Sequence, residues 1–237
     1  MRDQYVGDIT DYLKFSLIRA VVSPNAKLGI AWYYIPARDG RRDGRHTEYL
    51  KEDKWRELDP FLYSALGALE TNRTLSSLQE LKIWNSQTKF HAQPVESSRH
   101  RSLWAQEMLK SLEASDGIFA DPDNGLSKEG IISRKSATLD EISSLARNDR
   151  AVILIRFPHR RSSHVEQLQI HHSVLDAYRP VTVRTCVRLY NDKSRGFPRI
   201  RWFTLMNASE GMKESARQFA LRLDSIQGAS AEIEGKQ

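Results

Sequence analysis

The stretch GIFADPDNGLSKEG, residues 117–130, joins a short apolar run to a dense polar turn. Ile118 to Ala120 has the length and composition of a buried strand, and Asp121 follows at its carboxyl end. Pro122 has no backbone N–H, so we expect the strand to end there. Open α/β sheets bind their ligands at the carboxyl ends of their strands, which makes Asp121 a candidate catalytic residue.

Asp123, Asn124 and Gly125 have the residue types of a tight turn, in which glycine can adopt positive φ. A rigid turn at a sheet edge can aim polar side chains, so we take Asp123 and Asn124 as catalytic candidates beside Asp121. The alternative interpretation is that this sequence is simply good turn chemistry. Two carboxylates and an amide at one strand end favour the functional interpretation.

Outward from this stretch, helical and strand patterns alternate along the chain. Expected strands cover 28–35, 117–120, 151–157, 181–189 and 199–207, and expected helices cover 9–22, most of 48–112, 139–146 and 165–177. Only 190–198 separate the last two strands, which predicts an antiparallel hairpin. The expected fold is α/β, a Rossmann-like three-layer sheet that ends in this hairpin, with a helical insertion at about 48–112 after the first strand.

The composition is that of one folded domain. The chain has 237 residues, of which 40% are hydrophobic and 28% charged. We expect a single domain over 1–227 and a frayed polar tail over 228–237. No apolar run reaches the length of a membrane span, and the first residues lack the apolar core of a secretory signal. The single cysteine, Cys186, forms no internal disulfide, which favours a cytoplasmic location.

Positive charge gathers in one part of the sequence. Residues 150–201 hold eleven Lys and Arg against three acidic residues, a net charge of +8, whereas the rest of the chain sums to −2. Such an excess favours a surface that faces nucleic-acid phosphates. The alternative is the solvated face of a basic protein.

Two loops after expected strands carry candidate substrate-binding residues. PARDGRRDGRHTEYL, residues 36–50, offers guanidinium groups for phosphate or carboxylate and an imidazole that can move a proton near neutral pH. RFPHRRSSH, residues 156–164, offers phosphate-binding arginines. The candidates are Arg41, Arg45, His46, His159, Arg160 and Arg161. The alternative for the first loop is an exposed segment in which Thr47 caps the next helix.

Histidines also raise the question of a metal. His159 and His164, together with Asp121 and Asp123, could bind a divalent ion, but their spacing matches no established motif. His171 and His172 fall within an expected helix and are interpreted as surface residues.

Two motifs resemble a known family. FADPDNG (119–125) looks like a variant of the strand-end Asp-Pro-Pro-Tyr motif of adenine-N6 methyltransferases. YVGDITDYLKFSLI (5–18) is similar to the N-terminal Gly-Asn-x-x-Asp-x-x-Lys-His segment of the large-subunit ribosomal RNA adenine-N6 methyltransferases, which also carry a helical insertion after the first strand. Similar strings, including D-P-D-N-G, occur in an uncharacterised bacterial family.

The resemblance implies an S-adenosylmethionine cofactor, and implies that Asp121 accepts a hydrogen bond from the target amine. It places Lys14 and its neighbours near the cofactor, and the implied cofactor-binding residues are Gly7, Asp8, Lys14, Asp39 and Pro122. The chain departs from the family in two respects. Its first strand ends in IAWYYIPARDG rather than a Gly-rich turn, and Asp123 and Asn124 replace the second proline and the aromatic residue that stacks on a flipped base.

Three functional hypotheses follow. The first is an enzyme of methyltransferase-like fold that methylates an amine of a nucleic acid or nucleotide, using S-adenosylmethionine. The second is a metal-dependent phosphoesterase or nuclease with Mg²⁺ or Mn²⁺ on Asp121 and Asp123, and His46 or His159 as acid or base. The third is a non-catalytic nucleic-acid-binding protein. The oligomeric state is left open.

Overall fold

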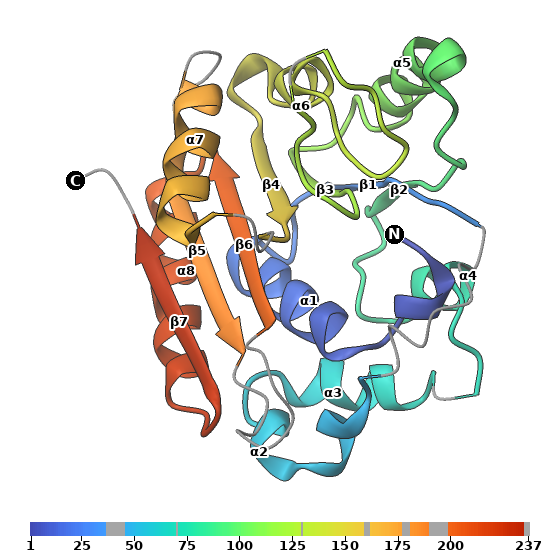
Figure 1. Ribbon diagram of the computed structural model, residues 1–237. Helices are drawn as coiled ribbons and strands as arrows, with labels where there is room; N and C mark the ends of the chain where they lie inside the picture. Colours follow the sequence, from blue (N-terminus) through green and yellow to red (C-terminus); the bar gives the residue numbers. More distant parts are fainter. Residues whose placement is uncertain are drawn as a thin grey trace.

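A seven-stranded sheet forms the centre of the protein (Figure 1). The computed structural model describes residues 1–36, 46–69, 71–128, 130–158, 162–176, 181–189 and 199–234. Within them the strands follow the spatial order β2-β1-β3-β4-β6-β5-β7. Their bounds are β1 Leu28–Trp32, β2 Lys89–His91, β3 Gly117–Asp121, β4 Ala151–Arg156, β5 Val181–Leu189, β6 Arg199–Met206 and β7 Ala229–Glu234.

The sheet is parallel on one side and antiparallel on the other. Strands β2, β1, β3 and β4 run parallel. Strand β6 lies between β4 and β5 and is antiparallel to both, and β7 pairs antiparallel with β5 at the edge. The predicted α/β fold with an antiparallel hairpin at its end is confirmed.

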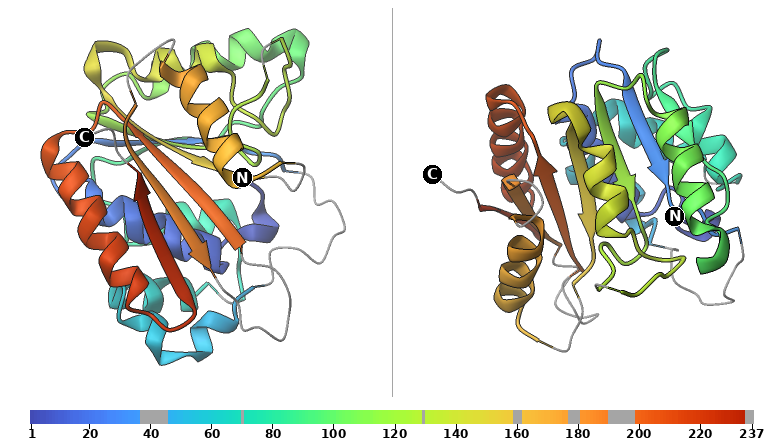
Figure 2. Two further views of the ribbon diagram at one scale, coloured as in Figure 1. Left: turned by 60° about the vertical axis from the view of Figure 1, so that its left-hand side comes forward. Right: turned by 90° about the horizontal axis from the view of Figure 1, so that it is seen from above.

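Helices cover both faces of the sheet, which gives three layers (Figure 2). One face carries α1 (Ile9–Val21) and α8 (Glu210–Asp224), with α2 (Asp53–Arg56), α3 (Pro60–Gly67) and α4 (Leu75–Gln79) beyond α1. The other carries α5 (Arg101–Ser111), α6 (Leu139–Leu145) and α7 (His164–Asp176). Short 3₁₀ turns cover Asp3–Tyr5, Glu48–Lys51, Ser98–His100 and Arg147–Asp149. In the described part of the chain, no helix combines the length and the apolar character needed to cross a bilayer.

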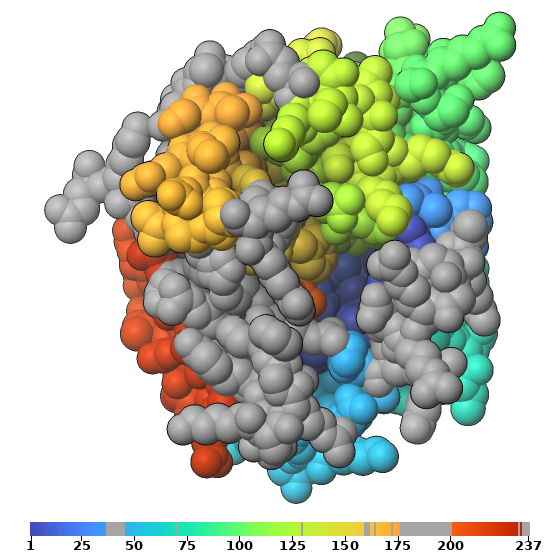
Figure 3. Space-filling model, viewed as in Figure 1, coloured from blue at the N-terminus to red at the C-terminus, as the bar shows by residue number. Residues whose placement is uncertain are grey.

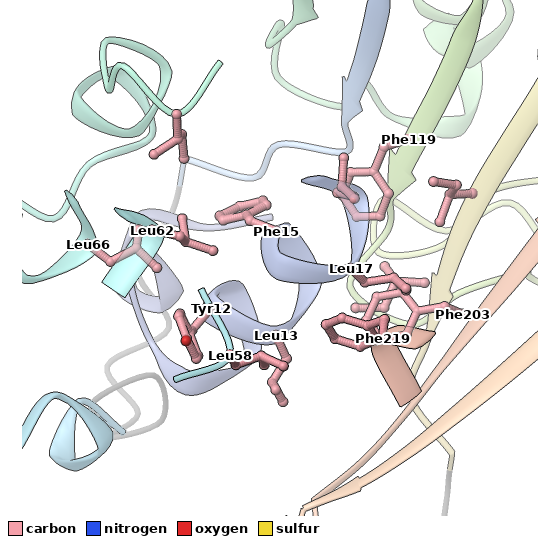
Figure 4. Close-up of a cluster of buried hydrophobic side chains, with 14 of the residues drawn as sticks. Tyr12, Leu13, Phe15, Leu17, Leu58, Leu62, Leu66, Phe119, Phe203 and Phe219 are labelled. Atoms are coloured by element: carbon pink, nitrogen blue, oxygen red, sulfur yellow. The ribbon is translucent and has the colours of Figure 1, made fainter. Parts of the chain in front are cut away.

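Helix α1 lies in the middle of the larger core. Asp8 caps it by accepting the backbone N–H groups of Thr10 and Asp11, as its residue type predicts. Apolar side chains project from α1 in several directions, so the helix is buried nearly all round. Figure 4 shows Leu17 beside Phe203 and Phe219, and Tyr12 beside Leu58.

Alternation along the parallel strands decides which side chains face α1. In β1, Ile30 and Trp32 belong to the core on the α1 face, whereas Ala31 belongs to the core under α5 and α6. In β3, Phe119 faces α1. Asp121, two residues later, therefore projects toward α1 at the end of the strand.

The opposite face is held by a buried ion pair between α5 and α6. The Arg101 guanidinium donates to both oxygens of Glu141 at 2.6 and 3.0 Å, and to the Ser136 carbonyl at 2.9 Å. Tyr33, which follows β1, donates its hydroxyl to Glu141 at 3.2 Å. Burial and the nearby Glu141 carboxylate raise the Tyr33 pKa well above its usual value, so the phenol stays protonated as a donor.

One expectation about a segment is incomplete and another is wrong. The segment 48–112 holds helices, as expected, and also a strand, because Lys89–His91 forms β2 on the outer side of β1. The polar end of the chain is not a frayed tail from residue 228, because Ala229–Glu234 pairs with β5 as β7. Helix α8, which precedes β7, also lies outside the sequence expectations. Both strands are short edge strands, which need little apolar alternation to pair.

Two local expectations are also wrong. His171 belongs to α7 and is buried against the sheet, where its Nε2 atom is 3.1 Å from the Thr204 hydroxyl of β6, so it is not a surface residue. Thr47 makes no side-chain cap to the 3₁₀ turn that follows it.

We predict that Arg101→Met lowers the free energy of unfolding by about 3–5 kcal/mol, because it leaves the Glu141 carboxylate buried without its cation. The matched control is Arg217→Met, which breaks an exposed pair with Glu214 and should cost less than about 1 kcal/mol. Urea unfolding of both variants measures the difference. Equal losses would show that the buried pair does not tie α5 to α6.

Candidate functional site

The strand order reverses direction at β1. The chain leaves β1 to form β2 on one side and then returns to form β3 on the other. In α/β sheets this reversal point is where ligands bind, just beyond the carboxyl ends of the two diverging strands. Asp121, the last residue of β3, is in register with Trp32, the last residue of β1, so both stand at this point.

A buried lysine joins this strand end to helix α1. The Lys14 ammonium lies 2.6 Å from Asp11 Oδ1, on its own helix, and 3.0 Å from Asp121 Oδ2. All three side chains are at most 5% exposed. We call Asp11, Lys14 and Asp121 the triad. Taking these charges out of water is unfavourable unless each finds a partner, and Lys14 serves both carboxylates.

Aromatic rings surround the ammonium. Lys14 Nζ is 4.9 Å from the centre of the Phe15 ring, 5.6 Å from Trp32 and 5.9 Å from Phe119. These rings exclude water from the triad and present their negative faces to the cation. Because the local dielectric constant is low, the attraction between Lys14 and its carboxylates is stronger than at the surface.

The triad changes the proton affinity of its members. Burial raises the Asp11 pKa from 3.8 to about 6; Lys14 opposes this rise, and the charges of Asp8 and Asp121 add to it. The Lys14 pKa is raised because the attraction of Asp11 and Asp121 outweighs the desolvation that would lower it. Lys14 is therefore a permanent cation at neutral pH.

Gly7 and Asp8, predicted to lie near the cofactor, belong to the turn that leads into the triad. The Gly7 N–H donates to Asp11 Oδ2 at 2.9 Å, and Gly7 has φ of +73°, which favours glycine. The Gly7 carbonyl accepts the Tyr49 hydroxyl. Asp8 serves as the helix cap, so its carboxylate is already committed to backbone N–H groups.

Asp123 lies beside the first two residues of the chain. The Met1 ammonium contacts Asp123 Oδ1 at 2.8 Å, and Arg2 Nε contacts Asp123 Oδ2 at 3.2 Å. Met1 also donates to the carbonyls of Tyr33 (2.8 Å) and Asp121 (3.3 Å). The first residue thus bridges the ends of β1 and β3.

The turn after Asp121 forms as predicted. Strand β3 ends before Pro122, which is buried. The Asn124 N–H donates to the Lys135 carbonyl, while its side-chain amide is exposed. Gly125 has φ of +74°, which confirms the expected left-handed position. Asn124 is thus the polar side chain of this turn that faces solvent.

His46 lies beside the start of α1, where its carbonyl accepts the Ile9 N–H at 3.0 Å. It is therefore close in space to the Asp8 cap, although 38 residues separate the two in sequence. The other predicted substrate-binding residues, and Asp39 among the predicted cofactor ligands, fall outside the described residues: Asp39, Arg41, Arg45, His159, Arg160 and Arg161.

Asp11 was not singled out from the sequence. Its signal is an acid three residues before a lysine, both inside an otherwise apolar helix, where neither charge has solvent beside it. Within the described ranges, no three His, Cys, Asp or Glu side chains converge in a way that could hold a metal ion. The carboxylates of Asp121 and Asp123 face cations of the chain itself.

Comparison with known proteins gives information about the fold and none about the function. No protein-family model matches the sequence, and no curated protein matches it significantly. Among solved structures, protein LPL1258 from Legionella pneumophila str. Philadelphia 1, described under the family model DUF519, is similar with a TM-score of 0.62 and 10% sequence identity, over 98% of each chain. At this identity the similarity shows a shared fold across the whole length.

We predict that the stability difference between the wild-type chain and Asp11→Asn depends on pH. The native protein keeps a proton on Asp11 up to about pH 6, whereas the unfolded chain loses it near pH 3.8. The wild type therefore loses stability relative to the variant as pH rises through this interval, by on the order of 3 kcal/mol. Urea unfolding from pH 4 to 7 measures the difference. A difference that stays flat, or that favours the wild type as pH rises, would contradict the raised pKa.

Proposed function

We propose that this protein is an enzyme of methyltransferase-like fold that methylates an amine of a nucleic acid or nucleotide, with S-adenosylmethionine as the methyl donor. The observation that carries the proposal is the hydrogen bond between Lys14 and Asp121, which are 107 residues apart in sequence. Each belongs to one of the two motifs through which the chain resembles the adenine-N6 methyltransferases. The motifs meet at the point where an α/β sheet binds its ligand.

Asp121 has the geometry of a group that orients an amine. Its Oδ2 atom is fixed by Lys14 at 3.0 Å, and Oδ1 accepts no hydrogen bond from any described residue. A carboxylate held through one oxygen can accept an amine N–H through the other and align the nitrogen lone pair for attack.

This edge of the sheet carries charges of both signs. The carboxylates of Asp8, Asp11, Asp121 and Asp123 lie among the cations of Met1, Arg2 and Lys14, and Arg73 and Arg201 contact the same N-terminal segment at Val6 and Thr10. S-adenosylmethionine, when bound, supplies the methyl group from a positively charged sulfonium. The end of β1 carries Trp32 and Tyr33 in place of glycines, so the described backbone there offers the donor no Gly-rich turn.

The substrate class rests on charge and on the turn. The segment 150–201 carries a net charge of +8 and includes β4, which pairs with β3 at the candidate site. Positive charge beside an amine-orienting carboxylate favours a phosphate-bearing substrate. The exposed amide of Asn124 can donate and accept hydrogen bonds toward a base edge.

We predict that titration of the wild-type protein with S-adenosylmethionine and with its demethylated product gives measurable heat in a calorimeter. Asp121→Asn should keep this binding and lose at least about 100-fold in methyl transfer to RNA, because an uncharged amide orients the amine poorly. Incorporation of a radiolabelled methyl group measures the transfer. Asp224→Asn removes an exposed carboxylate of α8 and should change neither value.

Absence of heat with both compounds would contradict the proposed donor. Salt-dependent binding of RNA by the same preparation, without turnover, would then favour a non-catalytic nucleic-acid-binding protein. Activity that requires Mg²⁺ or Mn²⁺ and releases a phosphate ester would favour the hydrolase.

A further inference from the structure

Arg156, the last residue of β4, differs in its hydrogen bonding from other partly or fully buried arginines of the described chain. Arg101, Arg134 and Arg150 each donate to a carboxylate or a backbone carbonyl. The Arg156 guanidinium makes no hydrogen bond or ion pair with the residues that the structure describes; it lies over the Trp202 ring at 5.5 Å. Burial lowers the pKa of Arg156, and no carboxylate offsets that effect.

The Gly125 turn lies directly against Arg156. A Cβ atom built on Gly125 would be 2.7 Å from Arg156 Cγ and 3.3 Å from its Cα, so only glycine fits there. This contact places the arginine beside the turn that begins at Asp121. The catalytic candidate and the arginine therefore stand at the carboxyl ends of the adjacent strands β3 and β4, with Asp121 on the α1 face of the sheet and Arg156 on the α7 face.

The backbone of the turn offers a second donor without an acceptor. Gly125 is buried, and its carbonyl accepts the Ala137 N–H at 2.9 Å. Its own N–H donates to nothing in the described part of the chain. Buried backbone N–H groups are nearly always paired, so this donor indicates an acceptor from outside the protein.

We propose that Arg156 and the Gly125 N–H bind a phosphate group of the substrate. In naming a nucleic acid or nucleotide as the ligand, this inference rests on the proposed function. Trp202 occupies one face of the planar guanidinium and holds it in place, which leaves its N–H groups free to bind phosphate oxygens in a bidentate manner. The contact would anchor the substrate at the carboxyl end of β4, next to the strand that ends in Asp121, without reading its sequence.

Arg156 is half-buried, and its neighbours come from two elements. Trp202 packs against Leu168 of α7, so Arg156 lies between the Gly125 turn and that helix. In the space-filling view, α7 (orange) and the segment after β3 (yellow-green) adjoin at the surface (Figure 3). The predicted phosphate-binding residues Arg160 and Arg161 follow β4 in sequence and lie outside the described residues.

The test compares Arg156→Gln with Arg222→Gln, which removes the same charge from the exposed end of α8. Fluorescence anisotropy with a labelled single-stranded RNA is measured over a series of salt concentrations. We expect Arg156→Gln to weaken binding about tenfold and to reduce the slope of log affinity against log salt by about 0.7, the value of one phosphate contact. Arg222→Gln should keep the affinity and the slope. Arg156→Lys keeps the charge but loses the planar guanidinium that binds in a bidentate manner, so its RNA affinity should lie between those of the wild type and Arg156→Gln.

Calorimetry with AMP and with inorganic pyrophosphate distinguishes a nucleotide from a strand as the ligand. Binding of AMP that depends on Arg156, with no gain for RNA, would assign a mononucleotide to the site. Equal affinity and slope in Arg156→Gln and Arg222→Gln, or wild-type protein that binds none of the probes, would overturn the inference.

The same preparations separate this inference from the proposed function. Phosphate binding that depends on Arg156, in a protein that gives no heat with S-adenosylmethionine, would overturn the donor and keep the anion site. Binding of S-adenosylmethionine, together with an RNA affinity that does not depend on Arg156, would support the proposed donor and overturn the anion site. Circular dichroism of each variant confirms that it is folded, and Arg156→Lys carries the comparison if the glutamine variant is not.

Discussion

A lysine ammonium buried between two carboxylates fixes helix α1 to the end of strand β3. Lys14 reaches Asp11 at 2.6 Å and Asp121 at 3.0 Å within a shell of aromatic rings. None of these charges has water to replace its partner, so removing one leaves another stranded in a medium of low dielectric. The arrangement of the N-terminal segment follows from this constraint. Gly7 donates to Asp11, Asp8 caps α1, and Met1 bridges the ends of β1 and β3.

The same constraint fixes the orientation of the Asp121 carboxylate. Its Oδ2 atom is bound to Lys14, and the proposed function assigns the other oxygen to the amine of the substrate. The turn that follows has a left-handed glycine packed on Arg156, so the acid and the unpaired cation are held on adjacent strands. In the proposed function, Arg156 would hold a phosphate of the nucleotide at the end of β4 while Asp121 orients the amine at the end of β3.

Most of the fold, and the strand end at Asp121, could be predicted from local sequence. A short apolar run followed by Asp121 and Pro122 encodes a strand end, and alternation of strands with helices encodes the layered sheet. The pairing of Lys14 with Asp121 could not be predicted from local sequence. The two residues are 107 positions apart, and only the order of the strands in the sheet brings them together. The edge strands β2 and β7 could not be predicted from hydrophobic pattern, because β2 is three residues long and β7 is polar. His171 was misassigned because its partner, Thr204, lies on a different element.

A double-mutant cycle on Lys14 and Asp121 tests the central claim most directly. Lys14→Met, Asp121→Asn and the double variant are compared with the wild type by urea unfolding at pH 7. If the two side chains depend on each other, each single change costs about 3–5 kcal/mol and the double variant loses less than their sum by about 2 kcal/mol or more. Losses that add to within about 0.5 kcal/mol would show that the buried lysine does not hold the strand end, and would contradict the account of this site.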